Sequence, residues 1–249
     1  MSLLLAITRE QWGLVFVTVI FILLFVVRIR STLNPFVEPL LFQNGRYAIG
    51  ILLAFLVSAL GFSIPFLTPI MLTDMYNLSP GFIGLVMVPA SLTAAILGKQ
   101  GGKIADKKGN TLLFILAACF LILAFILLSL MIGSSLILIL ITMTLIIGQV
   151  GHTFIVIAMS GTVAGSLAKE QAGVGMGLMS MLNFIASSIS AAFISLVIDR
   201  GTQSSWNPLY LFGEGTIYSN LYLIFTVSYA GLILIYFIRF GNKARWSNS

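Results

Sequence analysis

The chain has 249 residues, of which 59% are hydrophobic and only 8% are charged, and its formal net charge is +6 at pH 7. Because a soluble domain carries roughly a quarter of charged residues, this composition excludes an ordinary water-soluble fold and indicates a bilayer protein. The positive charge does not indicate a nucleic-acid partner, because the basic residues lie in short gaps between apolar stretches.

Seven apolar stretches are long enough to cross a bilayer as helices, which takes about 20 residues each. They cover residues 12–28, 48–72, 80–98, 111–132, 135–159, 174–198 and 219–240. These runs are continuous, whereas the strands of a membrane barrel alternate between apolar and polar residues. The predicted fold class is therefore an all-α integral membrane protein.

The basic residues are divided unequally between alternate loops. Of the 13 Lys and Arg residues, Arg9 and Arg200 lie on one side of the membrane and the other eleven on the opposite side. The eleven are Arg28, Arg30, Arg46, Lys99, Lys103, Lys107, Lys108, Lys169, Arg239, Lys243 and Arg245. The positive-inside rule then predicts a multi-pass protein of the cell membrane with a cytoplasmic C-terminus and an external N-terminus.

The stretch before the first span, Leu3 to Ile7, resembles the end of a transmembrane helix and is too short to cross the membrane by itself. It suggests that helices are missing upstream, and the alternative is a short external start. The predicted organisation has four parts. They are a linker transmembrane helix with a short external N-terminus (1–30), a cytoplasmic connector (31–47), a six-helix bundle (48–240) and a cytoplasmic tail (241–249). The bundle divides into two triplets of opposite orientation, an arrangement that many transporters use.

The segment from Gly98 to Asn110 predicts a tight cytoplasmic turn, because its glycines permit a reversal between two helices. Asp106 stands there among four lysines, close to the start of the next helix. Such a carboxylate can bind a neighbouring cation or helix N-terminus and form a conformational latch. The alternative is a basic topological anchor with a solvated acid.

Polar groups within the predicted spans are few. Gln149 and His152 are three residues apart and share a helix face, and Asn183 lies in the sixth span. They predict either a substrate or proton path, since histidine changes charge near neutral pH, or interhelical hydrogen bonds. Pro65, Pro69 and Pro89 can each kink a helix, and the sequence does not rank them. The lone Cys119 is predicted to pack in the core.

Three segments resemble a known family. The stretch containing Gly102, Asp106, Lys107 and Gly109 resembles the loop signature of the major facilitator superfamily, although Asn110 stands where members often have a basic residue. The stretches 171–178 and 182–184 resemble the penultimate span of its fourteen-span drug:proton antiporters, which include tetracycline, quinolone and antiseptic exporters. The segment 34–39 is similar to the one that follows their two extra central helices.

This resemblance implies that the first span is a central linker helix and that the other six form the C-terminal bundle of a multidrug efflux transporter. It implies amphipathic drugs as substrates, the proton gradient as the energy source, no cofactor, and an N-terminal six-helix bundle as a missing partner. It also implies the latch role for Gly102, Asp106, Lys107 and Gly109.

The chain lacks a Walker-type loop and has one Cys and one His, so neither an enzyme nor a metal site is expected. Two alternatives stay open, which are one chain of a split transporter and a membrane interaction protein that does not transport.

Overall fold

The computed structural model describes Ile20 and residues 39–132, 138–201, 207, 208, 210 and 215–241. Its helices are η1 (Pro39–Gln43), α3 (Gly45–Gly61), α4 (Ser63–Tyr76), α5 (Pro80–Lys108), α6 (Asn110–Met131), α7 (Leu138–Ala164), η2 (Lys169–Gln171), α8 (Ala172–Arg200) and α9 (Thr216–Phe240). No strand occurs among these described residues, which confirms the all-α class. The predicted first span, 12–28, and with it the linker helix, lies outside the described residues apart from Ile20.

Six of the predicted spans are confirmed within the described part of the chain. Six helical stretches there are long and apolar enough to cross a membrane, and α3 and α4 together make the first of them, Gly45–Tyr76. Pro80 begins α5 after the extended residue Ser79, because proline suits the first helical turn, where no N–H needs a partner. Asn44 caps α3 by accepting hydrogen bonds from the backbone N–H groups of Arg46 and Tyr47.

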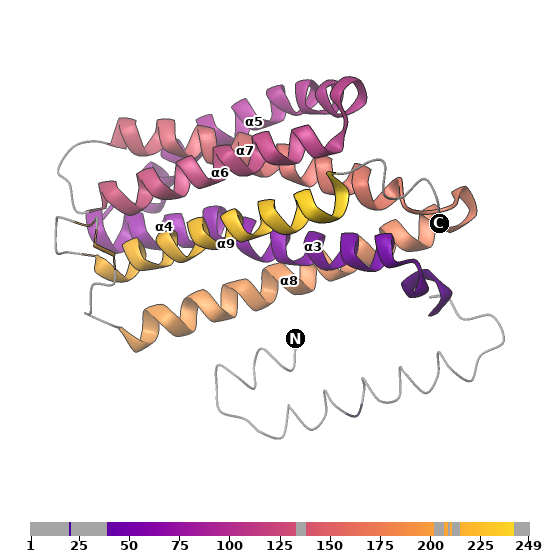
Figure 1. Ribbon diagram of the computed structural model, residues 1–249. Helices are drawn as coiled ribbons and strands as arrows, with labels where there is room; N and C mark the ends of the chain where they lie inside the picture. Colours follow the sequence, from indigo (N-terminus) through magenta and orange to yellow (C-terminus); the bar gives the residue numbers. More distant parts are fainter. Residues whose placement is uncertain are drawn as a thin grey trace.

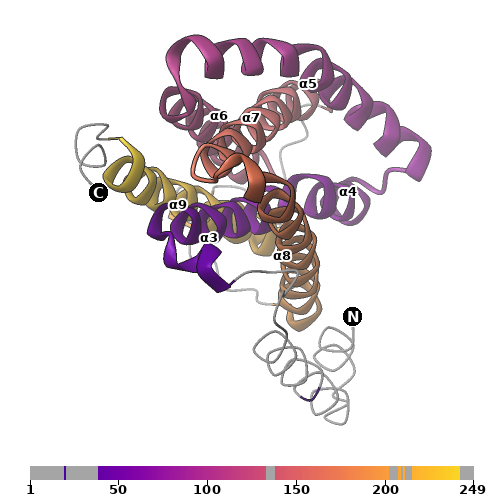
Figure 2. The same ribbon diagram turned by 90° about the vertical axis from the view of Figure 1, so that its right-hand side faces the viewer.

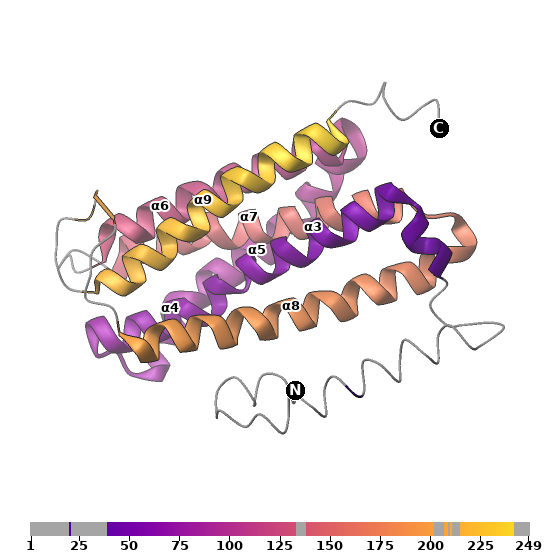
Figure 3. The ribbon, with the colours of Figure 1, turned by 60° about the horizontal axis from the view of Figure 1, so that its bottom comes forward.

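The helices form a bundle with α7 near its centre (Figures 1 and 2). Helix α7 packs chiefly against α6 and α5 and also against α3, while α9 packs against α6. Helix α8 lies along one side of the bundle and packs mainly against α3 (Figure 3). The first helix of each triplet therefore packs against the second helix of the other, α3 on α8 and α7 on α5. This exchange joins the two inverted three-helix units into one bundle.

Basic residues gather at one end of the bundle. The start of α3, the reversal at Gly109, η2 and the end of α9 all lie at this end (Figure 1). Among the described Lys and Arg residues, only Arg200 belongs to the opposite end, at the last residue of α8. The fold therefore collects the charges as the loop count predicts, and the cytoplasmic assignment of this end stays a prediction.

Each end of the bundle is tied by polar contacts. At the basic end, Asn44 Nδ2 donates to the carbonyl of Ser166 (2.7 Å) and the Tyr47 hydroxyl donates to that of Gly175 (3.0 Å). At the other end, Asn207 Nδ2 donates to the hydroxyls of Ser129 and Ser219, both at 2.8 Å. The contacts of Tyr47 and Asn207 are buried and so avoid the cost of an unpaired polar atom in an apolar interior, whereas the Asn44 contact is exposed.

The predicted cytoplasmic turn is a helix for most of its length. Helix α5 continues through Gly98, Gly101 and Gly102 to Lys108, and the reversal takes place at Gly109, whose φ of +87° favours glycine. Gly101 packs on α7, where an added Cβ would lie 2.7 Å from the Phe154 ring. The 19 residues of the predicted span 80–98 give about 28 Å of helix, which matches the bilayer core. The basic extension therefore continues α5 beyond the apolar span.

The expectation for Cys119 differs from the fold. Cys119 is exposed on α6 and does not belong to the core. The 3-10 helix η1 and the first turn of α3 fall within the predicted connector, 31–47, so the described part of that connector is helical. Cys119 differs from the expectation because apolar character alone does not distinguish a core face from a lipid face in a membrane helix.

Candidate functional site

The first membrane-spanning stretch is broken near its middle. Helix α3 ends at Gly61 and α4 begins at Ser63, with Phe62 between them. Pro65 explains the position, because a proline lacks an N–H group and its ring clashes with the carbonyl four residues earlier, here that of Gly61. Pro69 and Pro89 also lie inside helices, yet α4 and α5 continue through them. Pro65 is thus the proline that coincides with a break.

His152 of α7 lies against this break. A Cβ built on Gly61 would come within 2.6 Å of His152 Nε2 and 3.3 Å of the Tyr229 hydroxyl. His152 is partly buried, and no hydrogen bond joins it to another described residue. Three separate helices therefore bring an imidazole, a phenol and a glycine backbone together at the point where the first span is interrupted.

The Tyr229 hydroxyl donates to the carbonyl of Val57 (3.2 Å), one turn before the break. Tyr229 itself is fully buried in α9. Its bond holds α9 to the last turn of α3, so the break is enclosed by α7 on one side and by α9 on another. The helix break therefore lies inside the bundle and not at the surface of the bundle.

Four tyrosines on one face of α9 repeat this kind of contact, and the sequence analysis missed them. Tyr218 donates to the Asp74 carboxylate, and the hydroxyls of Tyr222 and Thr68 are hydrogen-bonded (3.2 Å). Both of these tyrosines therefore contact α4. Tyr229 is bound to α3, and Tyr236 bonds Thr162 of α7 (2.6 Å). Their spacing of four, seven and seven residues marks one helix face, and that periodicity is the signal that could have revealed them.

Gln149 lies one turn before His152 and is partly buried, without a hydrogen bond to a described residue. The two glycines beside this pair serve helix packing. An added Cβ at Gly148 would lie 3.2 Å from the Ile64 side chain at the start of α4, and one at Gly151 would lie 3.0 Å from the Ala117 carbonyl of α6. These two glycines therefore let neighbouring helices approach α7 closely, and Gly148 brings α7 against the start of α4.

Asn183 occupies a different position, on α8. Its Oδ1 is buried and has no hydrogen-bond partner, and the residue lines an open cavity of about 200 Å³ with Ser180, Phe184 and Ser187. No hydrogen bond among the described residues joins Asn183 to Gln149 or His152. The three predicted path residues thus divide into a pair at the helix break and a separate amide on α8.

The predicted latch residues lie on and just after the last two turns of α5. Asp106 and Lys107 are exposed, and Gly102 and Gly109 are partly buried. No ion pair joins Asp106 to a described residue. Asn110, where the resemblance fails, lies over α7, since a Cβ on Gly161 would come within 2.6 Å of its Oδ1. The latch assignment stays a prediction, with its carboxylate free to meet a partner outside this bundle.

Among the described residues, no group of three or more His, Cys, Asp or Glu side chains could hold a metal ion. The carboxylates described are Asp74, Asp106, Glu170 and Asp199, and each lies near a helix end or in a connection. His152 is consequently the one ionisable side chain that lies well inside a span among the described His, Asp and Glu residues.

The family model described as Major Facilitator Superfamily matches residues 3–191. The match includes α3 to α7 and the first two thirds of α8, and so it contains the helix break, Gln149, His152, Asn183 and the end of α5.

Proposed function

We propose, from the premise that this chain belongs to the Major Facilitator Superfamily, that it acts as the C-terminal half of a proton-coupled multidrug exporter. The family and the six membrane helices make it a multi-pass membrane protein of the transporter class. Drug:proton antiport by a protein of the cell membrane, with the basic end of the bundle in the cytoplasm, is the specific activity that we infer.

The helix break with His152 against it is the observation that carries the proposal. Transporters commonly build their substrate and ion sites near the bilayer midplane from interrupted helices at the interface of inverted repeats. Here the break lies in the first helix of one triplet, and the histidine lies on the first helix of the other. A side chain that gains or loses a proton at this position can change how the two triplets pack against each other.

The exposed apolar faces favour a second bundle as partner. Helix α5 exposes large side chains along the membrane span, among them Leu85, Val88 and Leu92, and α8 exposes Phe184 and Phe193. Lipid covers part of this surface in any membrane protein, but a drug cavity in this family is shared between two six-helix halves. We infer that the partner half supplies the other wall and the acid that accompanies His152.

A vesicle experiment tests the proposal. The chain is produced with the N-terminal six-helix bundle of a fourteen-span exporter, in inverted membrane vesicles, and uptake of ethidium is followed while a pH gradient is imposed. We expect uptake that collapses with the gradient and is lost in His152→Gln. Cys119→Ser is the matched control, because Cys119 is exposed on α6.

Three outcomes contradict the proposal. Uptake that is unaffected by His152→Gln places the proton elsewhere, and absence of any gradient-dependent uptake removes the antiport activity. Strong proton-dependent efflux by these 249 residues alone contradicts the assignment as a half-transporter. Ready co-purification with a separately produced N-terminal bundle, in contrast, favours one chain of a split transporter.

A further inference from the structure

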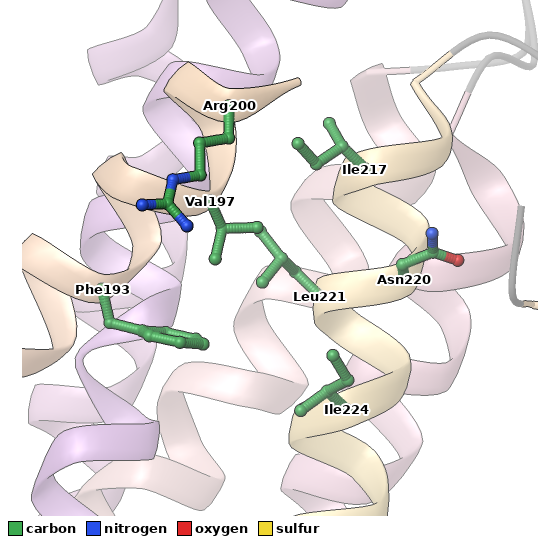
Figure 4. A pocket seen from close by; sticks show the side chains of 7 residues that line it. All are labelled: Phe193, Val197, Arg200, Ile217, Asn220, Leu221 and Ile224. Atoms are coloured by element: carbon green, nitrogen blue, oxygen red, sulfur yellow. The ribbon is translucent and has the colours of Figure 1, made fainter. Parts of the chain in front are cut away.

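An apolar groove runs between α8 and α9 at the end of the bundle opposite the basic one. Phe193 and Val197 of α8 form one wall, and Ile217, Leu221 and Ile224 of α9 form the other. Figure 4 shows the side chains of Val197 and Leu221 pointing toward each other across it. Because α8 packs mainly on α3, the two helices leave this space between them. The groove has a volume of about 260 Å³.

Arg200 closes the groove at its outer end. It is the only charged residue among those that line the groove, and no hydrogen bond or ion pair joins it to another described residue. The side chain runs along α8 above Phe193 (Figure 4). Asn220 also lines the groove, but its Oδ1 accepts from the backbone N–H of Asn207. The lining of the groove is therefore mainly apolar, and Arg200 is the one cation at its outer end.

The position of this cation matches the level of lipid phosphates. Arg200 follows the predicted span, 174–198, after Asp199, and so lies where the hydrocarbon core gives way to headgroups. The C-terminus of α8 and the N-terminus of α9 meet here with opposite partial charges, and the exposed Asp199 beside Arg200 does not line the groove. A guanidinium binds phosphate oxygens well because its donors match their geometry.

The groove is smaller than the pockets that enclose drug-sized molecules. Pockets that enclose such ligands measure roughly 300–1,000 Å³, and this groove is smaller and open along one side. A ligand that places only one part of itself in the groove fits better, and an acyl chain whose remainder lies in the bilayer is such a ligand.

We propose that this groove holds one acyl chain of an anionic glycerophospholipid while Arg200 binds its phosphate. An anionic lipid fits better than a zwitterionic one, because no carboxylate lines the groove to pair with an ammonium group. The site is separate from the helix break, and the proposal depends on the membrane location of the chain and not on drug:proton antiport.

Native mass spectrometry of the purified, delipidated chain tests the site. Phosphatidylglycerol and phosphatidylethanolamine with identical acyl chains are titrated separately, and the first bound lipid is followed. We expect the wild type to bind phosphatidylglycerol about tenfold more tightly, the difference that one charge-assisted contact provides. Arg200→Gln should remove this preference. Ile224→Trp, which fills the groove from an exposed position on α9, should weaken binding of both lipids.

Arg239→Gln is the matched control, since Arg239 is an exposed cation at the other end of α9. It should leave the preference intact. Thermal unfolding of each variant verifies that the bundle is folded. Equal binding of the two lipids by the wild type overturns the proposal, and so does a preference that survives Arg200→Gln. Unchanged binding by Ile224→Trp would place the lipid outside the groove and overturn it as well.

Discussion

The first helices of the two triplets differ in continuity although both are mainly apolar. The first, Gly45–Tyr76, is interrupted at Phe62, whereas α7 runs unbroken from Leu138 to Ala164. In the interrupted span, Pro65 has no N–H group to donate to the Gly61 carbonyl, and the continuous span supplies the polar side chain, His152, that lies close to Gly61. The comparison teaches that the two triplets differ in their first helices, one divided at Phe62 and the other continuous and packed against the division.

The supporting role of α7 predicts the largest effect. Gly151→Leu would place its side chain 2.9 Å from the Phe120 Cβ and 3.0 Å from the Ala117 carbonyl, which are parts of α6 that cannot rotate away. We expect the free energy of unfolding to fall by about 3 kcal/mol. Thermal unfolding in detergent measures this loss, with Gly84→Leu as the control, because Gly84 has open space around it. Equal stability of the two variants would show that α7 is not pressed against α6.

The break itself should be more tolerant. In Gly61→Leu the obstacle is the His152 ring, the mobile end of a side chain, so we expect a loss of about 1–2 kcal/mol. Adding His152→Ala should recover most of that loss, because the two changes share one space. Unfolding of the single and double variants measures the coupling. Strictly additive losses would mean that the two residues do not meet.

The hydrogen bond from Tyr229 should contribute less. Tyr229→Phe removes the donor to Val57 and leaves the ring in place, so we expect about 0.6 kcal/mol, the typical value for such bonds in membranes. Ser228→Ala is the control, since that hydroxyl bonds only the Ile224 carbonyl of its own helix. If the two substitutions cost the same, α9 does not hold the end of α3.

The smallest effect on stability should come from the end of α5. Asp106 is exposed, so Asp106→Asn should leave the unfolding free energy within about 0.5 kcal/mol of wild type. If Asp106 forms part of a latch, Asp106→Asn should nevertheless lower gradient-driven ethidium uptake severalfold. Lys103→Gln, an exposed change one turn earlier, is the comparison for charge alone. Uptake that stays at the wild-type rate in Asp106→Asn would leave the basic anchor as the better interpretation.

The six described spans could be predicted from the sequence because apolar length alone decides whether a helix crosses a bilayer. The break could not, since Pro65, Pro69 and Pro89 remove the same backbone bond and only packing decides which helix yields. The extension of α5 could not be predicted either. In the sequence Gly101 indicates a flexible turn, whereas in the fold it allows close contact with Phe154.

Half of the candidate site was visible in the sequence. His152 and Gln149 stand out because polar side chains are rare within spans. Their neighbours Gly61 and Tyr229 do not stand out, because they lie in other helices far away in the chain and have ordinary membrane-helix character. Asn183 was chosen by the same criterion as His152 and lies elsewhere, so residue type identified candidates but not their grouping.

Hydrogen exchange at the break is the most direct test of the claim that His152 couples protons to bending. We predict that the backbone amides of residues 61–64 and 66 lose protection when the pH is lowered, because a charged imidazole disturbs the packing there. In His152→Gln the same change of pH should cause no such loss of protection. Amides of residues 148–153 in α7 should keep their protection throughout. An identical pH response in wild type and His152→Gln would contradict the account.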